Sequence, residues 1–272
     1  MSTTFTKSFR SDSPGSPSLE AAGLRWLAEA ENQGGVSTPA IFGIGHLQLD
    51  MERIETVPAS RTAALAFGRA LAVTHAAGAP HFGAPPAGWR GQGGSIGLAP
   101  LPFTEASGAP LTWGHFYARH RVQPYVRWAI QRGGLSERSA GVFEDLAERL
   151  VAGDFDAPQP AGVPAVARIH GDLWSGNVMW TAPPHGPGHW SGATIIDPAA
   201  HGGHAETDLA MLGLFGVPHL AAILDAYNER CPIAPGWRAR VALHRLHPLL
   251  VHAMLFGPTY GREAVAIARQ YV

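Results

Sequence analysis

Two short apolar segments, each ending in a polar motif, constrain the fold of this chain most. Ala165 to Ile169 leads into His170, and Ala193 to Ile196 leads into Asp197. Both segments have the length and composition of buried strands. Because polar residues that follow neighbouring strands lie close together, we expect one site to form where the two strands end.

The first motif reads His170-Gly-Asp172-Leu-Trp174-Ser-Gly-Asn177. An Asp at a strand end can accept the proton of a hydroxyl that attacks phosphorus. The amide oxygen of Asn177 and the carboxylate of Asp197 are hard ligands of the kind that Mg²⁺ prefers. A lone His-Gly-Asp is usually a turn, as is a lone Ile-Asp after a strand, but the three parts in order predict a phosphoryl-transfer site.

The order Asp172, Asn177, Asp197 resembles the catalytic loop and metal-binding Asp of protein kinases. The His-Gly-Asp start and the Ile-Asp-Pro finish are more similar to the aminoglycoside phosphotransferase and choline kinase branch. Trp174 and Ser175 resemble the fructosamine kinase (ketosamine-3-kinase) family. Further similarity to that family covers the chain from about residue 5, in Phe116 to Arg119, Gly133 to Leu135, Asp197 to Ala199, Glu206 to Met211, Leu214 to Gly216, Gly236 to Arg240, His252 and Leu255 to Tyr260.

That resemblance implies roles for individual residues. Asp172 would be the catalytic base, Asn177 and Asp197 would hold Mg²⁺, Trp174 would line the sugar pocket, and His170 would brace the loop. ATP would be the phosphoryl donor. The acceptor would be a sugar hydroxyl of a small-molecule or protein-bound ketosamine, and the role would be deglycation or metabolite salvage.

The nucleotide residues implied by the resemblance lie near the N-terminus. Lys7, in Phe5-Thr6-Lys7, matches the phosphate-binding lysine, and Glu20 matches its helix partner. A solvated lysine and a first-turn glutamate that favours the helix dipole are the alternatives. Adenine would bind the backbone near Met51, Glu52 and Ile54, although an ordinary buried strand has a similar sequence.

The resemblance also implies an α+β, protein-kinase-like fold with two lobes, residues 1–57 and residues 58–272. Only six residues precede Lys7, where the family has two strands and a glycine-rich loop over the phosphates. We therefore expect a truncated N-terminal β-lobe and weak nucleotide binding. Gly91 to Ser95 could replace the cover by composition, but the family places a similar segment in the substrate region.

Hydrophobic periodicity predicts the remaining elements. Helices are expected at 17–30, 61–76, 113–132, 136–152, 206–214, 217–230 and 236–256, and strands at 40–42 and 47–54. Residues 78–110, rich in Gly and Pro, are expected to form an irregular loop. His201 and Glu206 follow the metal-binding Asp and are expected to border the substrate pocket.

Composition excludes several classes of protein. A net charge of −1 without a basic cluster argues against a nucleic-acid partner, and no apolar segment approaches a membrane span. One cysteine, Cys231, allows no internal disulfide, so we expect a cytoplasmic protein. Two other functions stay open: a kinase for an aminoglycoside or choline-like acceptor, and a pseudokinase with impaired nucleotide binding.

Overall fold

The N-terminal part is a small antiparallel sheet covered by one helix. The computed structural model describes residues 3–91, 93–106, 111–184 and 188–272. Strands β1 (Thr4–Ser8), β2 (Ile41–Ile44) and β3 (Gln48–Glu52) have the order β1-β3-β2. Helix α1 (Pro17–Ala28) begins at the predicted N-cap Ser16, whose side chain accepts the Leu19 N–H, and packs on the sheet through Leu24.

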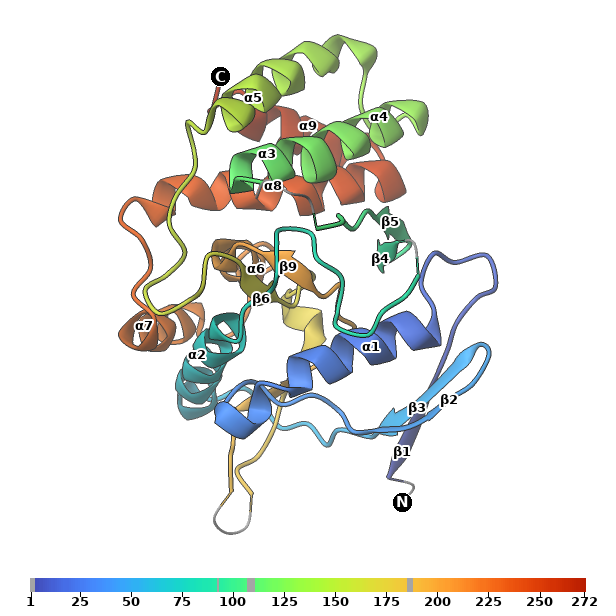
Figure 1. Cartoon of the computed structure of the whole chain (residues 1–272), viewed down its shortest axis with the longest axis vertical. Coiled ribbons are helices and arrows are strands. Elements are labelled where there is room, and N and C mark those ends of the chain that lie inside the picture. The colour runs from blue at the N-terminus through green and yellow to red at the C-terminus, as the bar shows by residue number, and fades with distance from the viewer. Residues whose placement is uncertain (1–2, 92, 107–110, 185–187) are drawn as a thin grey trace.

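The rest of the chain is mostly helical, and the end of the molecule away from the N-terminal sheet consists of helices (Figure 1). The long helix α8 packs against α9, α4 and α6, and α2 packs against α7. Two large apolar clusters stabilise this part. The bounds are α2 (Arg61–Ala76), α3 (Trp113–Tyr117), α4 (Gln123–Gln131), α5 (Ala140–Ala152), α6 (Ala205–Leu212), α7 (Leu220–Arg230), α8 (Trp237–Phe256) and α9 (Pro258–Ala268).

Two small antiparallel ladders carry the polar motifs. Strand β6 (Ala167–Ile169) pairs with β9 (His201–Gly203), and β7 (Val178–Trp180) pairs with β8 (Ala193–Ile195). The first motif follows β6, and Asp197 follows β8 after one residue. The ladders therefore bring together the two loops that the sequence predicted to meet.

Several boundaries differ from those predicted. Residues 94–101 form a hairpin, β4 (Gly94–Ile96) and β5 (Ala99–Leu101), rather than an irregular loop. Its turn contains Gly97 in the left-handed region, at φ 54°. Residues 92 and 107–110 of that predicted loop lie outside the described residues. Strands β7 and β9 and helix α9 were not predicted.

Helix α9 was missed because Gly257 and Pro258 stop one helix and start the next. Gly257 adopts φ 97°, which ends α8, and Pro258 occupies the first turn of α9. Among the described residues, no helix has both the length and the apolarity needed to cross a membrane. The lobe boundary between residues 57 and 58 stays a prediction.

Candidate active site

The loop after β6 is fixed mainly through its backbone. Gly171 has φ 80°, and a Cβ atom there would lie 2.3 Å from the Ala199 carbonyl oxygen, so only glycine fits. The Asp172 N–H donates to His170 Nδ1 at 3.2 Å. His170 Nε2 therefore carries the ring proton and donates it to the Ile196 carbonyl at 2.9 Å. This bond ties the Asp172 loop to the segment that carries Asp197.

A buried carboxylate that the sequence analysis did not identify holds the same loop. Asp208 on α6 accepts the backbone N–H of His170 at 2.7 Å and that of Gly171 at 2.9 Å. His75 Nε2 lies 3.2 Å from the same carboxylate, and His75 Nδ1 lies 2.8 Å from the Tyr227 hydroxyl. The available signal was an Asp directly followed by the apolar residues Leu209 to Leu212 in a helical segment, because a buried carboxylate needs partners.

Asn177 and Asp197 lie beside Asp172. Asn177 Nδ2 donates to the Asp172 carbonyl at 2.8 Å and to its carboxylate at 3.3 Å. The Ile196 N–H donates to the Asn177 carbonyl at 3.1 Å, which joins the two segments. Asp197 has φ 54°, a conformation that is uncommon for a residue other than glycine and often marks a functional site.

Lys7 lies between two carboxylates. Its Nζ is 2.6 Å from Glu20 Oε2 and 2.8 Å from Asp197 Oδ1. Burial lowers the pKa of Lys7, but Glu20 and Asp197 outweigh it, so the pKa is raised and the ammonium stays charged. Lys7 is thus neither a tail residue in solvent nor isolated from the loop residues.

Asp172 lies at the junction of two cavities. One, of about 400 Å³, is lined by Lys7, Glu20, Asn177 and Asp197 among others. The second, of about 480 Å³, has an apolar wall from α8, α9 and the segment after α6. Asp172 and Trp174 line both, as do Gly97 and Leu98 of the β4–β5 turn.

Burial also changes the acidity of Asp172. Desolvation raises its pKa to about 7, the nearby Asp197 and Asp208 carboxylates act in the same direction, and the hydrogen bond from Asn177 opposes them. A carboxylate with a pKa near neutrality is a better proton acceptor than an ordinary aspartate.

The predicted adenine-binding residues lie outside both cavities. Met51 is buried against Leu49 under α1. The Glu52 N–H donates to the Ala40 carbonyl at 2.8 Å, so this donor is used within the sheet region. A role in adenine binding for Met51, Glu52 and Ile54 therefore stays a prediction.

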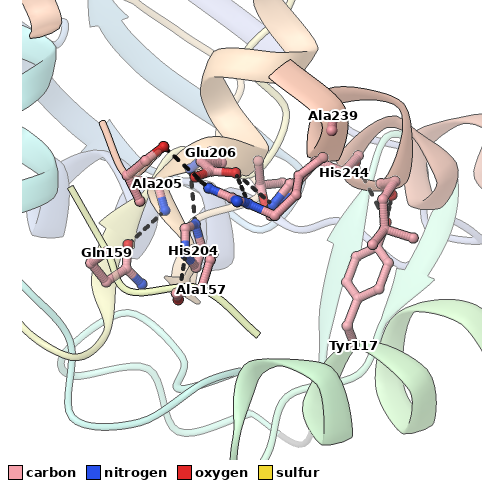
Figure 2. Close-up of polar contacts among 12 residues, drawn as sticks. Tyr117, Ala157, Gln159, His204, Ala205, Glu206, Ala239 and His244 are labelled. Carbon is pink, nitrogen blue, oxygen red and sulfur yellow. Dashed lines mark hydrogen bonds and ion pairs between the residues drawn. The ribbon is translucent and has the colours of Figure 1, made fainter. Parts of the chain in front are cut away.

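The sequence predicted that His201 and Glu206 border the substrate pocket, and such a role for them stays a prediction. Neither lines a cavity that contains Asp172. His201 is buried because β9 pairs with β6, and its Nδ1 lies 2.7 Å from the Ala199 carbonyl. Glu206 lies in the first turn of α6 and points into a buried polar network instead (Figure 2).

That network is satisfied by the protein itself. Arg240 forms two bonds to the Glu206 carboxylate, at 2.5 and 2.9 Å, and His244 Nε2 lies 3.4 Å from it. His204 Nδ1 accepts the Glu206 N–H at 3.2 Å. Burial raises the pKa of Glu206, but the bonds from His244 and Arg240 outweigh it and lower the pKa to about 2. Glu206 therefore joins α6 to α8.

Comparison with known proteins adds independent information. The sequence profile of the family described as "Fructosamine kinase" matches residues 3–272. The chain belongs to the fructosamine kinase family. This membership confirms the resemblance predicted from the sequence and the enzyme class, a phosphotransferase with a hydroxyl group as acceptor.

Relatives with family names align over different lengths. A "Probable ketoamine kinase" of Synechocystis is 32% identical over 257 residues, which cover 92% of this chain and 77% of the relative. "Ketosamine-3-kinase" of Mus musculus is 33% identical over 157 residues, which cover 58% of this chain and only 46% of the relative.

Solved structures confirm the predicted α+β, kinase-like fold. A crystal structure named "putative fructosamine-3-kinase" from Thermobifida fusca superposes with a TM-score of 0.81 at 43% identity, over 98% of this chain and 84% of that chain. The choline kinase LicA of Streptococcus pneumoniae gives a TM-score of 0.56 at 15% identity, over 98% and 84%. The second likeness concerns the fold alone.

Proposed function

We propose that this chain is an ATP-dependent kinase that phosphorylates a sugar hydroxyl of ketosamines. The observation that carries the proposal is the position of Asp172 between a polar cavity and an apolar one. The polar cavity has the lysine and carboxylates that a nucleoside triphosphate needs. The apolar cavity is open to an acceptor whose hydroxyl reaches Asp172.

Asp172 acts as the general base in this proposal. The acceptor oxygen forms a bond to the γ-phosphorus while the bond from that phosphorus to the β-phosphate oxygen breaks, and ADP leaves. The hydroxyl proton goes to the Asp172 carboxylate. Asn177 orients that carboxylate by donating a hydrogen bond to it at 3.3 Å, and the hydrogen bonds that the loop backbone donates to Asp208 limit its movement.

Lys7 binds the phosphates, and Glu20 positions it. The Glu20 side chain is buried and bonded to Lys7 at 2.6 Å, so the ammonium is held at the edge of the polar cavity. Its contact with Asp197 at 2.8 Å is one that phosphate oxygens can replace. Point-charge recognition of phosphate by lysine is common in kinases.

The residues present fit a magnesium ion. Asp197 and Asn177 offer oxygen donors on the wall of the polar cavity, and the Asn177 Nδ2 atom is already used by Asp172, which leaves its Oδ1 atom for a cation. When bound there, Mg²⁺ would offset the negative charge of the phosphates. Lys7, held in place by Glu20, would neutralise the part of the phosphate charge that Mg²⁺ does not offset.

The names of the relatives support a ketosamine acceptor, and so does Trp174. The indole is 37% exposed and lines both cavities, where it can cover the face of a sugar next to Asp172. An acceptor with a quaternary amine, such as choline, is a second candidate. The aromatic wall that includes Phe215 and Tyr260 favours it, because aromatic faces attract such cations.

A single experiment separates these functions. ADP release from ATP and Mg²⁺ is measured with a fructosamine, a ribulosamine, choline and an aminoglycoside, for the wild type and Asp172→Asn. We expect turnover with the ketosamines, and we expect the Asp172→Asn variant to have a kcat that is lower by about 10²-fold or more. Turnover with choline alone would favour the second candidate. ATP binding without turnover on any acceptor would contradict a kinase function.

A further inference from the structure

Large apolar side chains are exposed at the mouth of the apolar cavity. Four large side chains surround it, which we call the apolar rim: Leu98, Trp174, Phe215 and Phe256. Their exposed fractions are 62%, 37%, 42% and 64%. They come from the β4–β5 turn, the loop after β6, the segment after α6 and the end of α8. Large exposed apolar patches of this kind usually mark a binding surface.

Aromatic rings continue from the rim into the cavity. The Phe215 ring lies 5.9 Å from Trp174 and 5.2 Å from His252. His252 in turn lies 5.4 Å from Phe256 and 5.0 Å from Tyr260. Ile96, Met211, Pro248, Val251 and Leu255 complete the wall.

Charged partners are scarce on this surface. Among the residues that line the cavity in the described part of the chain, Asp172 is the only Asp, Glu, Lys or Arg. It lies at the junction with the polar cavity, where it faces the reacting hydroxyl. A carboxylate or a second ammonium on the part of the acceptor that points toward the rim would therefore lose hydration without gaining an ion pair. An apolar group at the same position would instead bind favourably, because its surface and that of the rim would both be removed from water.

The protonated amine of a ketosamine is compatible with this cavity. It follows the sugar by one bond, so it would lie among the aromatic rings, which attract a cation. The substituent on the nitrogen then points toward the rim. The size of that substituent is what the rim can recognise.

We propose that the acceptor cavity selects ketosamines whose amine carries a large apolar group, and that Leu98 and Phe256 determine this preference. The inference rests on the proposed ketosamine kinase function. It names the class of amine, an aromatic or branched aliphatic one, rather than the sugar. Leu98 and Phe256 contribute most because they are the most exposed rim residues and have the most surface to lose.

A matched pair of acceptors tests the preference. The fructose adducts of benzylamine and methylamine share the sugar and the ammonium and differ in a phenyl group. We expect kcat/KM for the benzyl adduct to be about tenfold higher or more, the size of a filled apolar pocket. Equal values for the two adducts would overturn the inference and leave the kinase function intact. Turnover of neither adduct would instead refute the function on which the inference rests.

Two rim variants locate the effect. Leu98→Ala and Phe256→Ala should each lower the benzyl-to-methyl ratio by about threefold or more, toward equality. Phe42→Ala is the matched control, because Phe42 is 57% exposed on β2 and lines neither cavity. Since both acceptors use the same ATP site, a change in nucleotide binding cancels in the ratio. A ratio unchanged in both rim variants would refute the assignment of these residues.

A protein-bound acceptor distinguishes a preference for small apolar amines from the docking of a protein surface. If the rim instead docks a protein surface, a fructose adduct on a lysine of a folded protein should exceed the benzyl adduct in kcat/KM. That result would overturn the small-amine preference. A lower kcat/KM for the protein adduct than for the benzyl adduct would support it.

Discussion

Replacing Asp208 by Asn should weaken both the fold and catalysis, although Asp208 contacts neither substrate cavity. Its carboxylate is fully buried and accepts two backbone N–H groups, from His170 and Gly171. It also lies 3.2 Å from His75 Nε2. An Asn side chain has one acceptor oxygen and adds an NH₂ donor. It can therefore satisfy only part of this set, and one backbone N–H loses its partner.

The cost follows from these contacts. A hydrogen bond to a charged group contributes about 1.5–3 kcal/mol, and a buried donor without a partner costs about 1–3 kcal/mol. We therefore expect the free energy of unfolding to fall by about 4 kcal/mol. For a chain of this size, each kcal/mol changes the Tm by about 2–4 °C, so the Tm should fall by about 8–16 °C.

Catalysis should be affected through the position of Asp172. A displacement of about 1 Å at a reacting group can cost about 10²-fold in rate. We expect a large loss of kcat with a smaller change in the KM for ATP, because Lys7 and Glu20 make no contact with Asp208. Thermal unfolding and steady-state kinetics measure the two effects. Asp225→Asn, at an exposed position on α7, is the control. An Asp208→Asn variant with the Tm and kcat of the wild type would refute the reasoning.

Three further predictions concern Lys7, the magnesium site and pH. Lys7→Met should raise the KM for ATP by about tenfold or more, since it removes the cation from the polar cavity; an unchanged KM would contradict the phosphate role. Removing Mg²⁺ with EDTA should abolish ADP release and restoring it should recover the rate, whereas activity in EDTA would contradict the role of Asp197. In the folded state the pKa of Glu206 is about 2, below its ordinary value of 4.5. The Glu206 carboxylate therefore contributes to the free energy of unfolding above about pH 4.5, and this contribution is lost as the pH falls toward 2. The gap in unfolding free energy between wild type and Glu206→Gln should narrow by about 3 kcal/mol over that range in denaturant titrations, and a constant gap would contradict the assignment.

The loops that carry Asp172 and Asp197 could be predicted because their information is local. One short stretch of sequence contains three signals: a short apolar strand, a glycine that must adopt positive φ and a fixed spacing from Asp172 to Asn177. The start of α1 could be predicted from Ser16 and Pro17 for the same reason. Elements with such local signals were found to within two or three residues.

The positions of His201 and Glu206 could not be predicted in this way. Both follow Asp197 closely in sequence, which suggested the pocket, but their direction depends on a strand pairing that is distant in sequence. His201 faces inward because β9 pairs with β6, and Glu206 meets Arg240 on α8, 34 residues later. Asp208 was missed for the same reason. Its partner His75 lies 133 residues before it.

The β4–β5 turn shows how the two kinds of information combine. By composition, the glycine-rich stretch before this turn was a candidate cover for the phosphates, whereas the family resemblance placed it near the substrate. Ser95 lines the polar cavity, and Gly97 and Leu98 line both cavities. The hairpin therefore borders both the proposed nucleotide site and the proposed acceptor site. Its side chains can meet a nucleotide and an acceptor at once, because the two cavities join at Asp172. A change at Leu98 is therefore expected to alter the choice of acceptor, while a change at Ser95 should act on the nucleotide side.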